Sequence, residues 1–249
     1  GRGSAIANGD IHIDVAFLGA SSCDPMGNSC GFSRSENAKS ICGSLGYALP
    51  DARYADNVVI LTDDLVSYPN TPTSISEHDV DWVVVGDSSK IASGAIRDTK
   101  NPRDILLAKE ACKVIVNSGY FKEGFSIQTG SGGASLAVVK YLRQTMIDQN
   151  VKASFALGGI TAHMVKLHEE GLIDHLIDVQ SFDKVAAESI KVDPKHKEVS
   201  ANEYASADEP GAATKFLDIV ILSALEVDVN FNVNVLVGSD GIIRGAIGG

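Results

Sequence analysis

Short runs of apolar, β-branched residues alternate along the chain with stretches whose apolar positions recur at helical spacing. The runs that predict buried strands are IDVAFLG (13–19), VVILT (58–62), DWVVVG (81–86), FSIQTG (125–130), ASFALGG (153–159) and LIDVQSF (176–182). The helical patterns are NPRDILLAKEACKVIV (101–116), ASLAVVKYLRQTMI (134–147), AHMVKLHEEG (162–171) and DKVAAESI (183–190). Strands that alternate with helices are typical of βαβ units around a mostly parallel sheet, so the pattern predicts an α/β fold.

The sequence also predicts where the first long helix starts and how the strands of the tail pair. Asn101 suits an N-cap and Pro102 suits the first helical position. The tail contains three strand-like runs with no helix between them, namely 216–229, 231–238 and 241–249. Because parallel strands need a crossover connection, we expect this tail to form an antiparallel or mixed edge.

Two segments of the chain repeat each other. IDVAFLGASSCDPMGNSCG (13–31) aligns without a gap with LDIVILSALEVDVNFNVNV (217–235). The matching positions are Asp14, Ala20, Asp24 and Asn28 in the first copy and Asp218, Ala224, Asp228 and Asn232 in the second. Coincidence between two ordinary strand-loop units is the alternative to a true repeat. A true repeat predicts two related halves.

The polar segment GDSSKIASGAIRDTKNP (86–102) is the candidate linker between these halves. We therefore expect residues 1–95 to be the C-terminal part of a first half and residues 96–249 to be the N-terminal and central part of a second. The chain starts at Gly1 without a Met and stops at the glycine turn GAIGG (245–249), which we interpret as a fragment of a longer protein.

Composition narrows the function. With a formal net charge of −11, the chain lacks the basic face that nucleic acid needs. No apolar run approaches the roughly 18–20 residues that span a bilayer. The cysteines show no metal-binding spacing. His163 and His168 are five residues apart and are expected on different sides of a helix, at its surface, so we expect no metal site. Reduced thiols and a cytoplasmic location are expected.

The turn GSGGAS (130–135) lies between a predicted strand and a predicted helix. Such a turn directs backbone N–H groups at one point, which suits an anion or a carbonyl oxygen. It lacks the Lys and hydroxyl that end a P-loop, and Ser135 takes the third glycine position of a dinucleotide fingerprint. An oxygen-binding turn and a purely structural role in packing the helix on the strand both stay open.

Four long motifs resemble one known family. They are IDVAFLGASSCDPMGN (13–28), VNSGYFKEGFSIQTGSGGASLAV (116–138), FALGGITAHMVKLHEEGLIDHLIDVQSFD (155–183) and the segment from Leu217 to Gly249. Together they look like the citrate lyase α-subunit family, over essentially the whole chain. Two loop-like departures are SRSENAKS (33–40), which looks inserted, and missing residues before GDSSK (86–90). The family's subunit is about twice as long, in line with a fragment.

The resemblance implies a CoA-transferase-like fold, with two related α/β halves, a mostly parallel sheet with helices on both faces, and mixed edge strands. It implies a transferase that exchanges acetate for citrate on the thiol of an acyl carrier (γ) subunit. A lyase (β) subunit then cleaves the citryl thioester to oxaloacetate and the acetyl thioester. The implied substrates are citrate and an acetyl thioester, on CoA or a phosphopantetheine-type arm, without a tightly bound cofactor.

Related CoA transferases carry a nucleophilic glutamate after the strand that follows the glycine turn. Ala162 of GGITAHM (158–164) takes that place here, so we expect a ternary complex and a mixed anhydride instead of a covalent enzyme thioester. The candidate catalytic residues are Gly130, Ser131, Gly132, Gly133 and Glu226. The candidate substrate-binding residues are Gly158, Gly159, Arg97, Arg244 and Asn232.

Each candidate has a plainer alternative. Arg97 and Arg244 suit citrate carboxylates but could be solvated surface charges, and Glu226 could be an ordinary loop carboxylate. Asn232 could close a turn, and Cys23, in the equivalent loop of the first half, is expected as a small buried residue. At the level of function, another acyl-CoA transferase or hydrolase of the same fold, and a noncatalytic ligand-binding or scaffold domain, remain alternatives.

Overall fold

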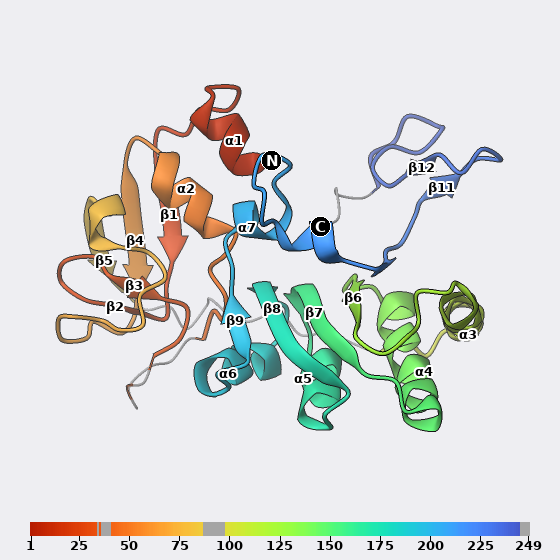
Figure 1. Cartoon of the computed structure of the whole chain (residues 1–249). Coiled ribbons are helices and arrows are strands. Elements are labelled where there is room, and N and C mark those ends of the chain that lie inside the picture. The colour runs from red at the N-terminus through yellow and green to blue at the C-terminus, as the bar shows by residue number, and fades with distance from the viewer. Residues whose placement is uncertain (34, 36–40, 87–97, 245–249) are drawn as a thin grey trace.

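The fold contains two larger sheets, each built of parallel strands, and the five-stranded one leads into the glycine turn (Figure 1). A computed structural model describes residues 1–33, 35, 41–86 and 98–244. The smaller sheet has the order β1-β4-β5 and consists of β1 (Ala16–Gly19), β4 (Val58–Thr62) and β5 (Trp82–Val85). The larger has the order β10-β6-β7-β8-β9 and consists of β6 (Phe125–Thr129), β7 (Ala153–Ile160), β8 (Ile173–Ser181), β9 (His196–Glu198) and β10 (Ile219–Ile221).

Helices cover both faces of the five-stranded sheet, as an α/β fold requires. Figure 1 shows α3 (Pro102–Asn117), α4 (Gly133–Gln149), α5 (Ala162–Glu169) and α6 (Lys184–Val192) on one side of it. On the other face, Tyr204 of α7 (Ala201–Ala205) packs with Leu157 and Val179. Helices α1 (Arg2–Ala7) and α2 (Ala48–Tyr54) pack together and against α7, and 3-10 turns span Glu77–Asp79 and Ala213–Phe216. Within the described ranges, no helix is both long and apolar enough to cross a bilayer.

Local capping explains where the helices begin. The Asn101 side chain accepts a hydrogen bond from the Arg103 N–H at 3.0 Å, and Pro102 opens α3, which confirms the predicted start. The carboxylate of Asp183 serves two helices, since one oxygen accepts from the Ala162 N–H at 2.7 Å and the other from the Ala186 N–H at 2.9 Å. A single buried side chain therefore fixes the starts of α5 and α6 relative to each other.

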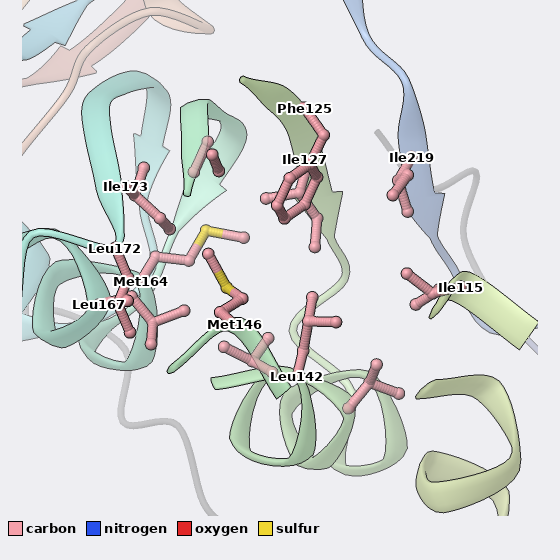
Figure 2. Close-up of a cluster of buried hydrophobic side chains, with 14 of the residues drawn as sticks. Ile115, Phe125, Ile127, Leu142, Met146, Met164, Leu167, Leu172, Ile173 and Ile219 are labelled. Carbon is pink, nitrogen blue, oxygen red and sulfur yellow. The ribbon is translucent and has the colours of Figure 1, made fainter. Parts of the chain in front are cut away.

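The core between the sheet and its helices is continuous and apolar. Figure 2 shows Leu142 and Met146 of α4 pointing toward the sheet, where Phe125 and Ile127 of β6 meet them. Leu142, Met146 and Phe125 are each 1 % exposed. Burial of each such side chain contributes about 1.5–3 kcal/mol, which holds β6 and α4, and so the turn between them, in fixed positions.

The tail differs from the prediction in one strand. β10 runs parallel to β6, with Ile219 opposite Ile127, because α7 and the 3-10 turn after it supply a crossover from β9. Ser126 Oγ and the Asp218 carboxylate lock this pairing, with Ser126 N–H donating to Asp218 at 2.9 Å. β10 is the edge strand of the sheet in the described part of the chain. The expected antiparallel pairing occurs in a separate hairpin at 226–234 and in a bridge between Val237 and Ile243.

That hairpin confirms the repeat at the level of hydrogen bonds. β2 (Ser22–Cys23) pairs antiparallel with β3 (Ser29–Cys30), and β11 (Glu226–Val227) pairs in the same register with β12 (Val233–Asn234). In the first turn, Asp24 accepts from the N–H and the side-chain amide of Asn28. In the second, Asp228 accepts the same two bonds from Asn232.

The two hairpins differ in what surrounds them. Asn70 covers the first, because its amide donates to Ser22 Oγ and to the Asn28 carbonyl, and Asp24 is fully buried. The second hairpin is open, with Phe231 85 % and Val229 94 % exposed.

One short segment joins the two sheets. Ser44 Oγ donates to the Asp178 carbonyl at 2.8 Å, and the Leu45 N–H donates to Glu198 Oε2 at 2.6 Å. A side chain at Gly46 would lie 2.1 Å from the Val199 carbonyl oxygen, so the backbone of this segment lies directly on β8 and the residues after β9.

Candidate functional site

The glycine turn is the N-terminal end of α4 and retains free backbone donors. Gly132 is the N-cap, with φ −70° and ψ 151°, and no side chain caps the helix or places an acid in its first turn. Within the described residues, no hydrogen bond uses the N–H of Ser131 or Gly132. The Gly130 N–H differs, since it donates to the Ile221 carbonyl of β10 at 2.8 Å.

Neighbouring strands and segments place the turn closely. A side chain at Gly133 would lie 2.8 Å from Thr99 Cβ, so this glycine is needed for the approach of the segment before α3. A Cβ at Gly132 would meet Ser223 Oγ at 3.4 Å, an ordinary contact, which sets the serine after β10 beside the turn. Gly130, Ser131, Gly132 and Gly133 therefore lie together, with Ser223 next to them.

Two buried hydroxyls lie at the carboxyl ends of the strands that lead to this region. Thr129 ends β6 directly before the turn and is 2 % exposed, and Thr161 follows β7 and is fully buried. Neither Oγ1 has a hydrogen-bond partner in the described part of the chain. Because a buried polar atom without a partner is costly, these hydroxyls call for a functional explanation.

Gly158 and Gly159 have different local roles. Gly158 has a φ of +102° and faces the Gln128 side chain, so its backbone adopts a shape that other residues rarely take. Gly159 makes room for Phe182, whose ring would lie 1.9 Å from a Cβ at that position. Both glycines lie in β7 at a register shift between Gly158 and Gly159, beside β6 and β8.

Glu226, Asn232 and Arg244 are engaged in the tail. Glu226 accepts from Ser239 N–H and Oγ at 2.9 and 2.6 Å, and these bonds lower the pKa of its carboxyl group. Asn232 closes the turn onto Asp228, as its plainer alternative predicts. Arg244 forms a two-bond ion pair with Asp240, which raises the pKa of the guanidinium. In this structure, none of these three groups lies free.

Some expectations lie outside the described residues. Arg97 belongs to residues 87–97, which the structure does not describe, and so does the expected boundary near residue 95. Most of the insertion-like segment at 33–40 is likewise outside them.

Ala162 stands where the resemblance to CoA transferases implied a nucleophilic glutamate, and its methyl side chain cannot act as a nucleophile. Ala162 is the first residue of α5, and its N–H donates to Asp183. Asp183 itself is buried, and hydrogen bonds from the starts of α5 and α6 occupy both of its oxygens.

The structure shows how far the cysteines and several of the histidines are buried and what they contact. All four cysteines are free, and Cys23 is fully buried as expected, with burial raising the pKa of its thiol. The surface expectation was wrong for His168, whose ring bonds the Ile173 carbonyl and Asp193 with only 8 % of the side chain exposed. His163 is also largely covered, at 22 %. His12, Asp14 and Asp56 are the one group of potential metal ligands in the described part, and all three are exposed.

The chemistry available at the turn is stabilisation of negative charge. Two adjacent N–H groups at a helix N-terminus, with hydroxyls at the ends of neighbouring strands, suit an oxygen on which charge develops. Sequence reasoning found the turn but missed Thr129, Thr161 and Ser223. A threonine ending a buried strand just before a glycine turn is the signal that could have identified Thr129.

Comparison with known proteins gives a consistent result. The family model for the citrate lyase α subunit matches residues 1–249. The citrate lyase α chain of Haemophilus influenzae is 58 % identical over 253 aligned positions, and that of Escherichia coli is 56 % identical. The alignments cover 100 % of this chain but 50 % and 49 % of those proteins, so the chain spans about half the length of these relatives.

Solved structures agree on the fold. A crystal structure described as the α subunit of citrate lyase from Streptococcus mutans, in complex with citrate, has a TM-score of 0.89 and 57 % identity. The match covers 98 % of this chain and 48 % of that one. A 4-hydroxybutyrate CoA-transferase from Porphyromonas gingivalis, at 15 % identity and a TM-score of 0.59, covers 91 % of this chain and 54 % of its own. The last likeness shows the CoA-transferase-like fold alone.

Proposed function

The chain belongs to the citrate lyase α-subunit family, and from that membership we propose that it forms the central part of a citrate-dependent acyl transferase. The proposed reaction takes the thiol of an acetyl thioester and attaches it to citrate, giving a citryl thioester and acetate. The thiol belongs to CoA or to the phosphopantetheine-type arm of an acyl carrier subunit, and the proposed complex also contains a lyase subunit. The four free thiols support a cytoplasmic setting.

The observation that supports this proposal most directly is the pair of backbone N–H groups of Ser131 and Gly132, at the start of α4, which have no hydrogen-bond partner among the described residues. We propose that they form an oxyanion hole for the carbonyl oxygen of the thioester. Such a donor is typically worth about 2.7–4 kcal/mol of transition-state stabilisation. Gly133 lets the neighbouring segment close over this end of the helix. Gly130 contributes by fixing the turn to β10 rather than by donating to substrate.

In the proposed first step, a citrate carboxylate oxygen attacks the acetyl carbonyl carbon. The carbon–sulfur bond breaks, so the thiol leaves as a thiolate and a mixed anhydride of acetate and citrate remains. In the second step, the thiolate attacks the citryl carbonyl of that anhydride and acetate departs. Bonds and charges balance without a protein nucleophile, in keeping with Ala162 and with the fully bonded Asp183.

Holding both acyl groups in register is the second requirement of this route. Alignment of two bound reactants can supply up to about 7–11 kcal/mol of the barrier. We propose that the β7 backbone at Gly158 and Gly159 lies along the substrate, beside the hydroxyls of Thr129 and Thr161. These hydroxyls have no other partner in the described chain and can donate to a citrate carboxylate.

Arg97, Arg244, Glu226 and Asn232 complete the proposed set. Arg244 would bind a citrate carboxylate only after leaving Asp240, and Glu226 would act only after releasing Ser239. Asn232 acts through the shape of its turn. We also propose that residues 1–95 and 96–249 belong to two related halves, since the two hairpins share their register and turn bonds.

The decisive test uses a family-length protein that carries these 249 residues. The protein is mixed with acetyl-CoA and citrate, and mass spectrometry follows citryl-CoA, acetate and any enzyme-bound CoA. Citryl-CoA with no bound CoA supports the proposed route, and a covalent CoA adduct contradicts it. Acetate without citryl-CoA would indicate a hydrolase. No turnover, even with an acetylated carrier protein, would favour a binding or scaffold role.

A further inference from the structure

A cavity of about 480 Å³ lies between α4 and α5, and its lining is rich in cations. Lys140 and Arg143 line it from α4, and His163 and Lys166 line it from α5. In each helix the two residues are three apart, so they share one helix face. Because α4 packs against α5, the two charged faces meet at this cavity.

The local charge is opposite to that of the whole chain. Three cations and the Asp98 carboxylate are among the lining residues, and Glu170, which pairs with Arg143, adds a second negative charge. Three positive and two negative charges leave a small positive excess, while the chain carries a net charge of −11. The cluster therefore favours a small anion over a metal ion or a neutral molecule.

The cations keep donors that existing pairs do not use. Lys140 Nζ contacts Asp98 at 2.5 Å, which leaves two of its three N–H donors. Arg143 spends two of its five N–H groups on Glu170, at 2.5 and 3.0 Å. Lys166 forms no ion pair with any residue that the structure describes. The site therefore offers both a guanidinium and ammonium groups to an incoming ligand.

His163 supplies an independent sign of a missing partner. Its Nε2 lies 3.0 Å from Asp98, which fixes the ring, whereas its Nδ1 is buried and has no hydrogen-bond partner among the described residues. Because Nε2 directs its proton at the Asp98 carboxylate, Nδ1 of the neutral ring is an acceptor. A hydroxyl of a bound ligand, or a protonated phosphate oxygen, would therefore supply the missing partner and recover the free energy that an unpartnered buried nitrogen costs.

We propose that this cavity binds a phosphoryl group, with Arg143, Lys140 and Lys166 as its cationic contacts and His163 as a neighbouring hydrogen-bonding group. A guanidinium fork combined with ammonium groups matches the tetrahedral dianion of a phosphate. The volume of about 480 Å³ is large enough for a phosphate or a diphosphate. Lys140 lies seven residues along α4 from Gly133, about 10 Å at 1.5 Å per residue, so the site is separate from the turn. The inference does not rest on the proposed function.

The test measures binding of inorganic pyrophosphate to a family-length protein that carries these 249 residues, by isothermal titration calorimetry at low salt. The site variant is Arg143→Gln with Lys166→Gln. The matched control, Lys113→Gln with Lys184→Gln, removes the same charge from exposed surface pairs. Loss of two charge-assisted contacts should weaken binding by about tenfold or more in the site variant and by less than about twofold in the control. Equal weakening in both, or no binding to the unaltered chain, overturns the proposal.

Competition then identifies the source of the phosphoryl group. If CoA displaces pyrophosphate from the chain, and does so poorly in the site variant, the phosphates of a CoA-type arm occupy the cavity. If inorganic phosphate competes and CoA does not, the ligand is a free phosphate ion. A third result, in which citrate binds this cavity and pyrophosphate does not, makes it a carboxylate site and overturns the proposal.

Discussion

Gly27 and Phe231 occupy the same position in two equivalent hairpin turns, and both have positive φ, +109° and +63°. Each residue's N–H donates to the carbonyl of the turn aspartate, Asp24 or Asp228, at 3.0 and 3.1 Å. The first turn meets this backbone requirement with a glycine, whereas the second holds a bulky aromatic residue in a conformation that costs most residues about 1–2 kcal/mol. The shared turn geometry therefore outweighs residue preference at this position.

Replacing Gly27 should destabilise the protein. In Gly27→Ala, the new Cβ would lie 2.8 Å from Val80 Cβ, and the residue would keep an unfavourable φ. We expect the free energy of unfolding in urea to fall by about 1–3 kcal/mol. An unchanged urea midpoint would show that the turn can adopt another backbone shape.

Replacing Phe231 by glycine should stabilise the second turn, because glycine adopts positive φ without steric cost. Little apolar burial is lost, since the Phe231 residue is 85 % exposed. Amide hydrogen exchange at Asp228, whose N–H donates to the Asn232 carbonyl, should become slower. Faster exchange would mean that the phenyl ring, rather than the backbone, stabilises this turn.

Removing one free donor at the glycine turn should reduce transfer activity. Gly132→Pro deletes an N–H that has no partner in the described part of the chain, and the existing φ of −70° already suits proline. We expect kcat in the family-length protein to fall by about 100- to 1,000-fold, the usual effect of losing an oxyanion donor.

Gly132→Ala is the matched control, since it keeps the N–H and places its Cβ in ordinary contact with Ser223. Its activity should stay within about tenfold of the unaltered protein, well above that of the proline variant. Equal losses in both variants would assign the glycine a packing role.

The buried hydroxyls of Thr129 and Thr161 should lower the free energy of unfolding and raise the transfer activity. Thr129→Val and Thr161→Val each remove a buried polar atom without a partner, so the free energy of unfolding should rise by about 1–3 kcal/mol. If the hydroxyls donate to substrate, kcat/KM should drop by about tenfold or more.

Thr145→Val provides the comparison, because that hydroxyl already contacts the Tyr141 carbonyl and Cys112. It should lower stability and leave kcat/KM unchanged. Variants at Thr129 and Thr161 that lose stability and keep activity would rule out their proposed contact with substrate.

Glu198 should make stability depend on pH. Burial is the main cause that raises the pKa of this carboxyl above its ordinary value, with Asp178 adding to it. Between the ordinary and the raised pKa, the folded state binds more protons than the unfolded state, so stability falls as pH rises through that window. Glu198→Gln keeps an acceptor for the Leu45 N–H and removes the charge. Its urea midpoint, relative to the unaltered chain, should rise as the pH increases above about 4.

Glu188→Gln serves as the control, since Glu188 lies on the surface of α6 beside Lys184. A relative stability that shows no pH trend in Glu198→Gln, or the same trend in Glu188→Gln, would contradict the assignment.

Structural features that depend on residues close together in the sequence could be predicted. Asn101 and Pro102 predicted the start of α3 because capping acts within one helical turn. The match of Asp24 and Asn28 with Asp228 and Asn232 predicted a repeated strand-loop unit, which the structure shows as two hairpins whose side chains bond their own turns.

Structural features that depend on residues far apart in the sequence could not be predicted. Nothing local shows that Asp183 starts α5 as well as α6, a contact that spans 21 residues. The parallel direction of β10 depends on its partner Ser126, 92 residues away from Asp218. Arg244 was assigned to citrate from the glycines beside it, whereas Asp240, four residues earlier, is its partner in the structure. Thr129 gains significance only from the absence of a partner, which requires coordinates.

In the described part of the chain, no strand pairs with the outer edge of β10, and this bears on how the chain behaves at high concentration. An uncovered strand edge presents backbone donors and acceptors to any other extended segment, and natural proteins guard such edges with charge, proline or a covering element. Here Val220 and Leu222 are each 49 % exposed, and the open hairpin beyond them adds Val229 and Phe231. The 249-residue chain should therefore self-associate through this face, forming aggregates that added charge on β10 would disperse.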